Sequence, residues 1–112
     1  MSTATPARFF LPLAVFLLTA CSPGDSGSAG PPPAIYTSSC APCHADGLGG
    51  APIVGDSADW ETRVAKGMRK VRENGINGFE GATGLMPPKG GRTDLSDEEI
   101  NSLVDYMVEA SR

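Results

Sequence analysis

The clearest hydrophobic pattern lies near the carboxyl end of the chain. Apolar residues recur there at the i, i+3, i+4 and i+7 spacing that marks one face of a helix. These residues are Ile100, Leu103, Val104 and Met107. Ser96 stands just before this stripe and Glu99 follows three positions later, which is the pattern of a capping box. We therefore predict a helix that begins after Ser96 and buries the stripe in a core.

A second apolar stripe predicts a helix from about residue 58 to residue 73. Its members recur at intervals of four, four and three residues. They are Trp60, Val64, Met68 and Val71. Asp56 or Ser57 can cap the start of this helix, and Asn74-Gly75 is predicted to end it. Residues 75–94 are rich in glycine and proline and are predicted to be mostly loop.

A short first helix is predicted over residues 34–43. Pro33 suits its start, where the N–H that proline lacks would have no partner in the helix. Pro42 falls in the last turn, so the helix is expected to be irregular near its end. No strand pattern of any length appears in the sequence, so the predicted elements are all helices.

The amino-terminal segment has the features of an export signal. A ten-residue apolar run at 9–18 follows Arg8; it is too short to span a bilayer comfortably but suits the core of a signal peptide. Leu18-Thr19-Ala20-Cys21 resembles a bacterial lipoprotein box, which implies cleavage before Cys21 and lipid on its sulfur. An ordinary signal peptide, with Cys21 incidental, is the alternative.

These features divide the chain into three parts. We predict a lipoprotein signal peptide at 1–20, a lipidated amino terminus with a flexible linker at 21–33, and a folded domain at 34–112. The whole chain has 40% apolar and only 6% aromatic residues, so we expect a thin protein core that needs an additional stabilising group. The net charge of −4 argues against nucleic-acid binding.

The candidate chemistry lies in Cys40-Ala41-Pro42-Cys43-His44, which has the spacing of covalent haem attachment. Residues i and i+3 share one helix face, so both thiols can add to the vinyl groups on one edge of a porphyrin. His44 would then offer its imidazole to the iron, and the haem c would supply the missing core. A zinc site and a thioredoxin-like pair are poorer alternatives, because the chain has only one histidine, only one further cysteine and no strand–helix–strand context.

The sixth position of the iron has methionine, lysine, tyrosine, water or no ligand as candidates. Met68 and Met107 belong to apolar stripes and are predicted to be core residues. Met86 lies instead in a predicted loop before Pro87-Pro88, whose restricted backbone can aim the thioether. We therefore predict Met86 as the second axial ligand, the alternative being a partly buried loop methionine and a five-coordinate iron.

An imidazole and a thioether together raise the reduction potential and leave no position for small molecules. We therefore expect a one-electron carrier and not an enzyme. Two alternatives remain: a haem enzyme or ligand sensor with an open sixth position, and an electron-transfer subunit of a larger oxidoreductase complex.

These motifs resemble those of the class I c-type cytochromes, and among them the bacterial cytochrome c-five group. The matching positions are Tyr36, 40–44, 50–52, Gly55-Asp56, Trp60, Arg63, Gly67, 86–91 and 97–99. The resemblance implies an all-α fold of three to four helices and long loops around one covalently attached haem. It also implies that the first and last helices cross, with Tyr36 against Leu103 and Tyr106.

The same resemblance implies roles for further residues. The Pro52 carbonyl would accept a hydrogen bond from His44, and Arg63 and Trp60 would either contact the haem propionates or be a surface arginine and a core tryptophan. In one respect the sequence departs from the group, since Arg92 and Leu95 stand where many members carry two cysteines. We expect the segment before the last helix to be looser for that reason.

The expected partners are a redox donor and a redox acceptor that bind transiently to a monomer. The lipid on Cys21 would hold the domain to a membrane, facing the periplasm, and Ser22 favours the outer over the inner membrane. The basic residues of 63–72 are expected to form a solvated helix face. The alternative is weak, salt-sensitive docking of an acidic partner through Lys66 and Lys70.

Overall fold

The structure is a computed structural model that describes Met1 and residues 33–112. The predicted signal peptide after Met1, the lipidation site at Cys21 and all but the last residue of the linker lie outside the described residues. Within the described part, no helix is both long and apolar enough to cross a membrane.

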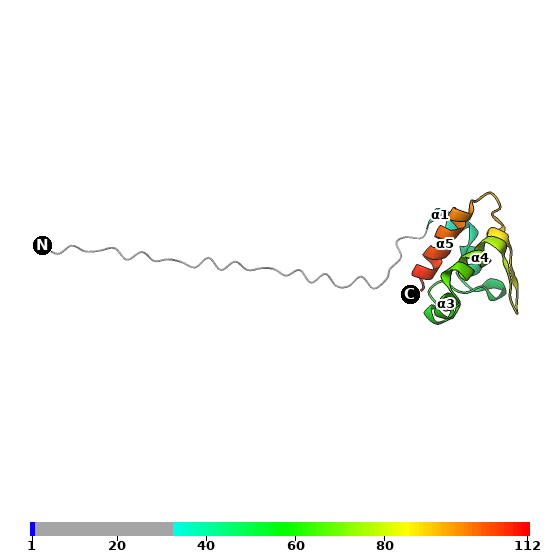
Figure 1. Ribbon diagram of the computed structural model, residues 1–112, viewed down its shortest axis with the longest axis horizontal. Helices are drawn as coiled ribbons and strands as arrows, with labels where there is room; N and C mark the ends of the chain where they lie inside the picture. The colour runs from blue at the N-terminus through cyan, green and yellow to red at the C-terminus, as the bar shows by residue number, and fades with distance from the viewer. Residues whose placement is uncertain (2–32) are drawn as a thin grey trace.

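The described domain is built from five α-helices, two 3-10 turns and one short hairpin (Figure 1). In chain order the elements are α1 Ala34–Ser39, α2 Ala41–His44, η1 Leu48–Gly50, α3 Ser57–Val64, α4 Met68–Asn77, β1 Phe79–Glu80, β2 Leu85–Met86, η2 Pro88–Gly91 and α5 Asp97–Glu109. The all-α prediction is confirmed. There are five α-helices instead of three to four because each of the first two predicted helices is divided in two.

The last helix, α5, forms the centre of the core. Its capping box is present: the Ser96 hydroxyl accepts from the Glu99 amide at 3.2 Å, and the Glu99 carboxylate accepts from the Ser96 amide at 2.8 Å. The predicted stripe is buried, together with residues from other elements. The buried apolar residues are Tyr36, Trp60, Leu95, Ile100, Leu103, Val104, Met107 and Val108.

Helix α1 packs on α5 through aromatic rings. Tyr36 is buried, and its ring centroid lies 5.0 Å from that of Tyr106 at an interplanar angle of 59°. The predicted contact of Tyr36 with Tyr106 is confirmed, and Leu103 belongs to the same core cluster. The first helix is also irregular where Pro42 predicted it to be, because α1 ends at Ser39 and α2 starts afresh at Ala41.

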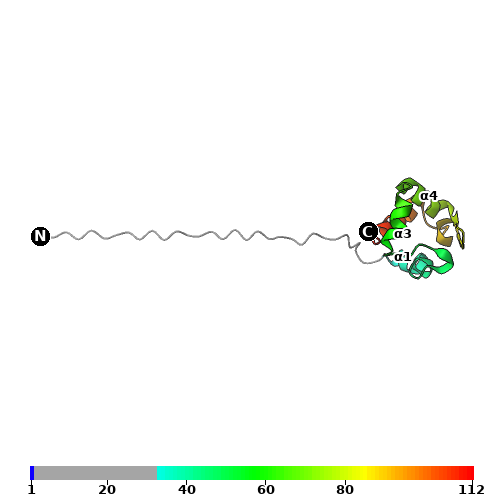
Figure 2. The same cartoon turned by 90° about the horizontal axis from the view of Figure 1, so that it is seen from below.

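The single helix predicted over 58–73 is wrong. The structure has two helices, α3 and α4, which are separated by a turn (Figure 2). Gly67 occupies this turn with a φ of 100°, a conformation that side chains disfavour. At the end of α3, the Gly67 amide donates to the Val64 carbonyl at 2.8 Å. At the start of α4, the Gly67 carbonyl accepts from the Lys70 amide at 3.0 Å.

The predicted stop at Asn74-Gly75 is also wrong, because α4 continues to Asn77. Gly75 is buried, and a Cβ placed there would lie 2.7 Å from the Val104 side chain, so this glycine allows α4 to approach α5 closely. Arg72 joins the same two helices through two 2.9 Å hydrogen bonds to Asp105. Beyond α4, strands β1 and β2 pair antiparallel within the predicted loop.

Candidate functional site

A cavity of about 640 Å³ opens on one side of the domain. This volume is in the range of pockets that hold a small molecule or cofactor, about 300–1,000 Å³. Its lining includes the five residues of the described chain that the sequence predicts to bind the cofactor. These residues are Cys40, Cys43, His44, Pro52 and Met86. Residues more than 40 positions apart therefore face the same space.

The attachment motif forms one tight helical turn. The amides of Cys43 and His44 both donate to the Cys40 carbonyl, at 3.2 and 2.9 Å. Both cysteines are free thiols, with Cys40 half-buried and Cys43 exposed. Burial raises the pKa of the Cys40 thiol above its ordinary value.

The His44 imidazole is buried and held in one orientation. Its exposed fraction is 6%, and its Nδ1 lies 2.9 Å from the Pro52 carbonyl oxygen. A carbonyl oxygen can only accept, so Nδ1 carries the proton and Nε2 keeps its lone pair. An imidazole oriented in this way is a good iron ligand, so His44 fits the haem that the attachment motif implies.

The segment around Pro52 is itself held at three further points. The Val54 amide donates to the His44 carbonyl at 2.9 Å, and the Gly55 amide donates to the Ser111 hydroxyl at 2.9 Å. The Trp60 indole donates to the Ile53 carbonyl at 2.9 Å. The indole N–H is thus already used, and this buried side chain fits the core-tryptophan alternative better than a propionate contact.

Sequence reasoning did not identify Ser111 as a support of the site. Ser111 is 3% exposed and lies 56 positions after Gly55. Its hydroxyl accepts a hydrogen bond from the Gly55 amide. A serine beyond the last turn of an amphipathic helix carries no sequence signal of such a contact. The helical stripe that precedes it nevertheless predicts that this end of α5 lies against the core.

Met86 reaches the cavity from a later part of the chain than the attachment motif. It ends strand β2, is half-buried, and is followed by Pro87 in an extended conformation. Gly78 makes this approach possible, because a Cβ there would lie 2.7 Å from the Met86 carbonyl oxygen. Met107 also lines the cavity, but it is 3% exposed and belongs to the α5 core stripe, as predicted.

Basic side chains predominate around the cavity. Its charged lining residues are Arg63, Lys66, Lys70 and Glu80. Arg63 Nη2 donates to Asp59 at 3.2 Å, whereas the buried Nε has no acceptor in hydrogen-bonding geometry, although Asp59 Oδ1 lies 3.1 Å away. A carboxylate bound in the cavity would offer an acceptor to this arginine. The lining around Arg63 therefore fits an acidic group such as a haem propionate.

Comparison with known proteins yields one consistent group. Residues 27–107 match the family described as cytochrome C oxidase, cbb3-type, subunit III. The chain is 47% identical to cytochrome c-555 of Chlorobaculum thiosulfatiphilum over 79 residues, which cover 70% of this chain and 92% of that protein. It is 44% identical to cytochrome c5 of Azotobacter vinelandii over 73 residues, which cover 61% of this chain and 80% of that protein.

A solved structure gives the same grouping at the level of the fold. The chain is similar to one in the crystal structure of the electron transfer complex of nitrite reductase with cytochrome c, with a TM-score of 0.61 and 33% identity. The match covers 70% of this chain and 90% of that one.

Proposed function

Because this chain belongs to the class I c-type cytochromes, which bind haem c covalently and transfer electrons, we propose specific residues for that task. Cys40 and Cys43 would attach the haem, and His44 and Met86 would supply the protein ligands to its iron. The observation that supports this assignment is that all four residues line one cavity. When bound, the haem supplies the centre that gains and loses one electron.

The chain's own residues set the properties of that centre. The Pro52 carbonyl, 2.9 Å from His44 Nδ1, fixes the imidazole and makes it a better donor to the iron. The neutral thioether of Met86 favours the reduced state and raises the reduction potential. The backbone of both proposed ligands is held by hydrogen bonds to other residues. Their positions would therefore change little between oxidation states, as an electron carrier requires.

The test of this function is whether the iron is closed to small ligands. We expect the absorption spectrum of the reduced holoprotein to remain unchanged under carbon monoxide at neutral pH, because Met86 occupies the sixth position. Rapid carbon monoxide binding by the unmodified protein would contradict the proposal. It would instead support a haem enzyme or a ligand sensor.

A second candidate function is an electron-transfer subunit of a larger oxidoreductase. It is favoured by the matching family, whose description is that of an oxidase subunit. Size-exclusion chromatography of the natively expressed, detergent-solubilised protein distinguishes the two. Elution alone, as a monomer, supports the free carrier, and stable co-elution with other oxidoreductase subunits supports the second candidate.

We infer that an acidic redox partner docks at the rim of the cavity. Every described lysine and arginine except Lys66 and Lys70 forms an ion pair. These two unpaired lysines both line the cavity. The exposed apolar side chains of Leu48 and Leu85 line the same cavity. Unpaired positive charge beside exposed apolar surface suits a weak, transient encounter with a protein of opposite charge.

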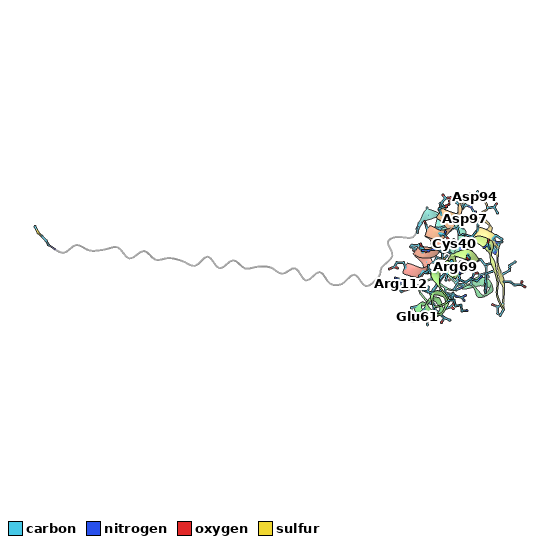
Figure 3. All side chains as sticks on the ribbon, viewed as in Figure 1. Cys40, Glu61, Arg69, Asp94, Asp97 and Arg112 are labelled. Carbon is cyan, nitrogen blue, oxygen red and sulfur yellow. The ribbon has the colours of Figure 1, made fainter. Side chains whose placement is uncertain are left out.

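Neutralising these two lysines is expected to slow electron transfer to an acidic partner about tenfold at low salt, because steering by charge is lost. The variant is Lys66→Gln with Lys70→Gln, and the second-order rate is measured by stopped-flow at increasing ionic strength. Arg69→Gln with Arg112→Gln is the matched control, since these residues (Figure 3) do not line the cavity. Equal rates for both double variants would reject docking at the rim.

We propose that the haem domain at 34–112 faces the periplasm and is tethered by residues 21–33 to lipid on Cys21, after removal of residues 1–20. The motif Leu18-Thr19-Ala20-Cys21 and the Ser/Gly/Pro-rich segment that follows support this arrangement. Ser22 favours the outer membrane.

The mass of the mature protein is the corresponding measurement. We expect a polypeptide that starts at Cys21 and carries one haem and more than one acyl chain, because a single chain gives only marginal membrane binding. Cys21→Ala should remove the acyl mass and release the protein from the outer-membrane fraction. A mature protein with an unmodified Cys21 would contradict lipid anchoring.

A further inference from the structure

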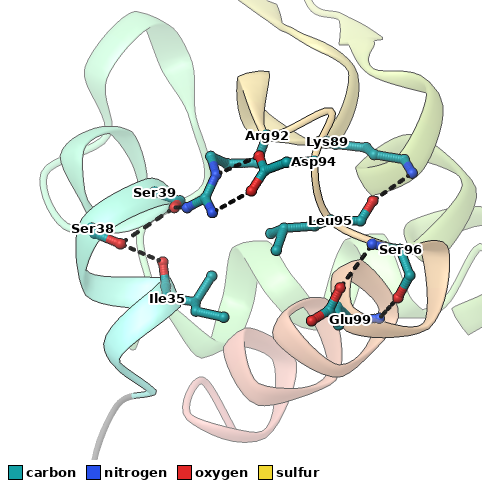
Figure 4. Close-up of polar contacts among 9 residues, drawn as sticks. All are labelled: Ile35, Ser38, Ser39, Lys89, Arg92, Asp94, Leu95, Ser96 and Glu99. Carbon is teal, nitrogen blue, oxygen red and sulfur yellow. Dashed lines mark hydrogen bonds and ion pairs between the residues drawn. The ribbon is translucent and has the colours of Figure 1, made fainter.

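The segment after Met86 is connected to the attachment motif by one arginine (Figure 4). Arg92 donates through Nε and Nη2 to the two carboxylate oxygens of Asp94, at 2.8 and 2.7 Å. Its Nη1 donates to the Ser39 hydroxyl at 2.6 Å. Ser39 ends α1 and directly precedes Cys40, so Arg92 links the Met86 side of the cavity to the cysteine side.

The same segment is connected to α5 by one lysine. Lys89 Nζ donates to the Leu95 carbonyl at 2.8 Å and forms an ion pair with Asp97 Oδ1 at 2.8 Å. Lys89 is the one non-glycine residue of the described chain with a positive φ, 55°. Such a conformation is unfavourable for a side-chain-bearing residue, so the surrounding contacts must hold it. Leu95, between the two links, is buried in the core.

We propose that Arg92 and Lys89 are positioning residues for Met86, which hold residues 86–95 closed over the cavity so that the thioether stays on the iron. This inference rests on the proposed role of Met86. The two links run from the Met86 segment to α1 and α5, and neither side chain lines the cavity. They therefore act through the backbone of the segment.

The Arg92 link persists at neutral pH. The hydrogen bonds from the Arg92 guanidinium lower the pKa of Asp94 from its ordinary value of 3.8 to about 2, so the carboxylate is ionised at pH 7. Removal of Arg92 at that pH therefore breaks a charged, two-point contact as well as the bond to Ser39.

The test measures how readily the segment opens. Imidazole binds the ferric holoprotein only after Met86 leaves the iron, so its dissociation constant reports the population of the open segment. We expect Arg92→Ala and Lys89→Ala each to bind imidazole about five- to tenfold more tightly at pH 7, because charged hydrogen bonds are lost. Arg92→Lys, which keeps the charge but not the fork, should give an intermediate value.

Two controls separate positioning from general destabilisation. Arg72→Ala removes a similar two-point pair with Asp105 between α4 and α5, both outside residues 86–95, and should lower the urea midpoint without tightening imidazole binding. Ser39→Ala alone should tighten imidazole binding, and in combination with Arg92→Ala should add less than its single effect.

The inference is overturned if the alanine variants at Arg92 and Lys89 bind imidazole as the unmodified protein does. Failure of the proposed function has a different signature. The ferric unmodified protein would then lack the far-red absorption band of a sulfur–iron bond, whatever its affinity for imidazole.

Discussion

Met86→Ala is expected to open the iron to carbon monoxide while leaving the haem attached. Alanine offers no donor atom, and the remaining protein ligand is the His44 imidazole. The reduction potential should fall by a substantial part of the roughly 0.8 V range over which axial ligands set haem potentials, because the thioether no longer favours reduced iron. Carbon monoxide titration and spectroelectrochemistry of the purified holoprotein measure both effects.

Met107→Leu is the matched control for this substitution. It also removes a thioether from the cavity lining, but leucine conserves most of the buried volume in the α5 stripe. This variant should keep the unmodified potential and refuse carbon monoxide. If Met107→Leu opened the iron and Met86→Ala did not, the sulfur ligand would belong to α5 and the assignment of Met86 would be wrong.

The second large effect is expected for Cys40→Ser with Cys43→Ser. Without the two thiols no covalent bond to haem forms, and the intact mass should lack the haem completely. The folded protein should also fail to accumulate, because the domain must then stabilise itself around a cavity of about 640 Å³ with few buried apolar side chains. Mass spectrometry and the yield of folded protein give the two readouts.

The third cysteine supplies the comparison. Cys21→Ser leaves the described domain unchanged and should retain one covalent haem while losing the acyl chains. Recovery of the Cys40/Cys43 double variant with haem still covalently bound would exclude these residues as the attachment site.

Local signals explain which parts of the fold could be predicted from the sequence. The capping box of Ser96 and Glu99 and the stripe that follows lie within a few residues of one another, and the structure has both. The attachment motif is equally local. Its residues are contiguous, and one helical turn brings them together without any long-range contact.

The two helix predictions that were wrong both concern glycines. Gly67 and Gly75 both lie within or next to an apolar stripe of constant period, and periodicity cannot tell a turn from a packing contact. Gly67 breaks the helix because the chain takes a positive φ there, whereas Gly75 stays helical because it meets Val104. The role of Gly75 depends on the position of α5, which is distant in sequence.

The segment before α5 shows a second limit. The sequence predicts a looser segment there because Arg92 and Leu95 replace the cysteines of the related group. The structure gives it other restraints: Leu95 is buried, and Arg92 reaches Ser39, 53 positions earlier. An arginine two positions before an aspartate suggests a solvated surface pair, so its long-range contact could not be inferred without the fold.

The hydroxyl of Ser111 has a consequence for how the domain matures. Synthesis runs from the amino terminus, so residues 40–44 are made well before Ser111 can accept a hydrogen bond from the Gly55 amide. The attachment motif is therefore complete early in synthesis, whereas one hydrogen bond that holds the segment next to His44 depends on a late residue. Truncation just ahead of Ser111 would therefore yield a pigmented protein whose proximal ligand is less firmly held.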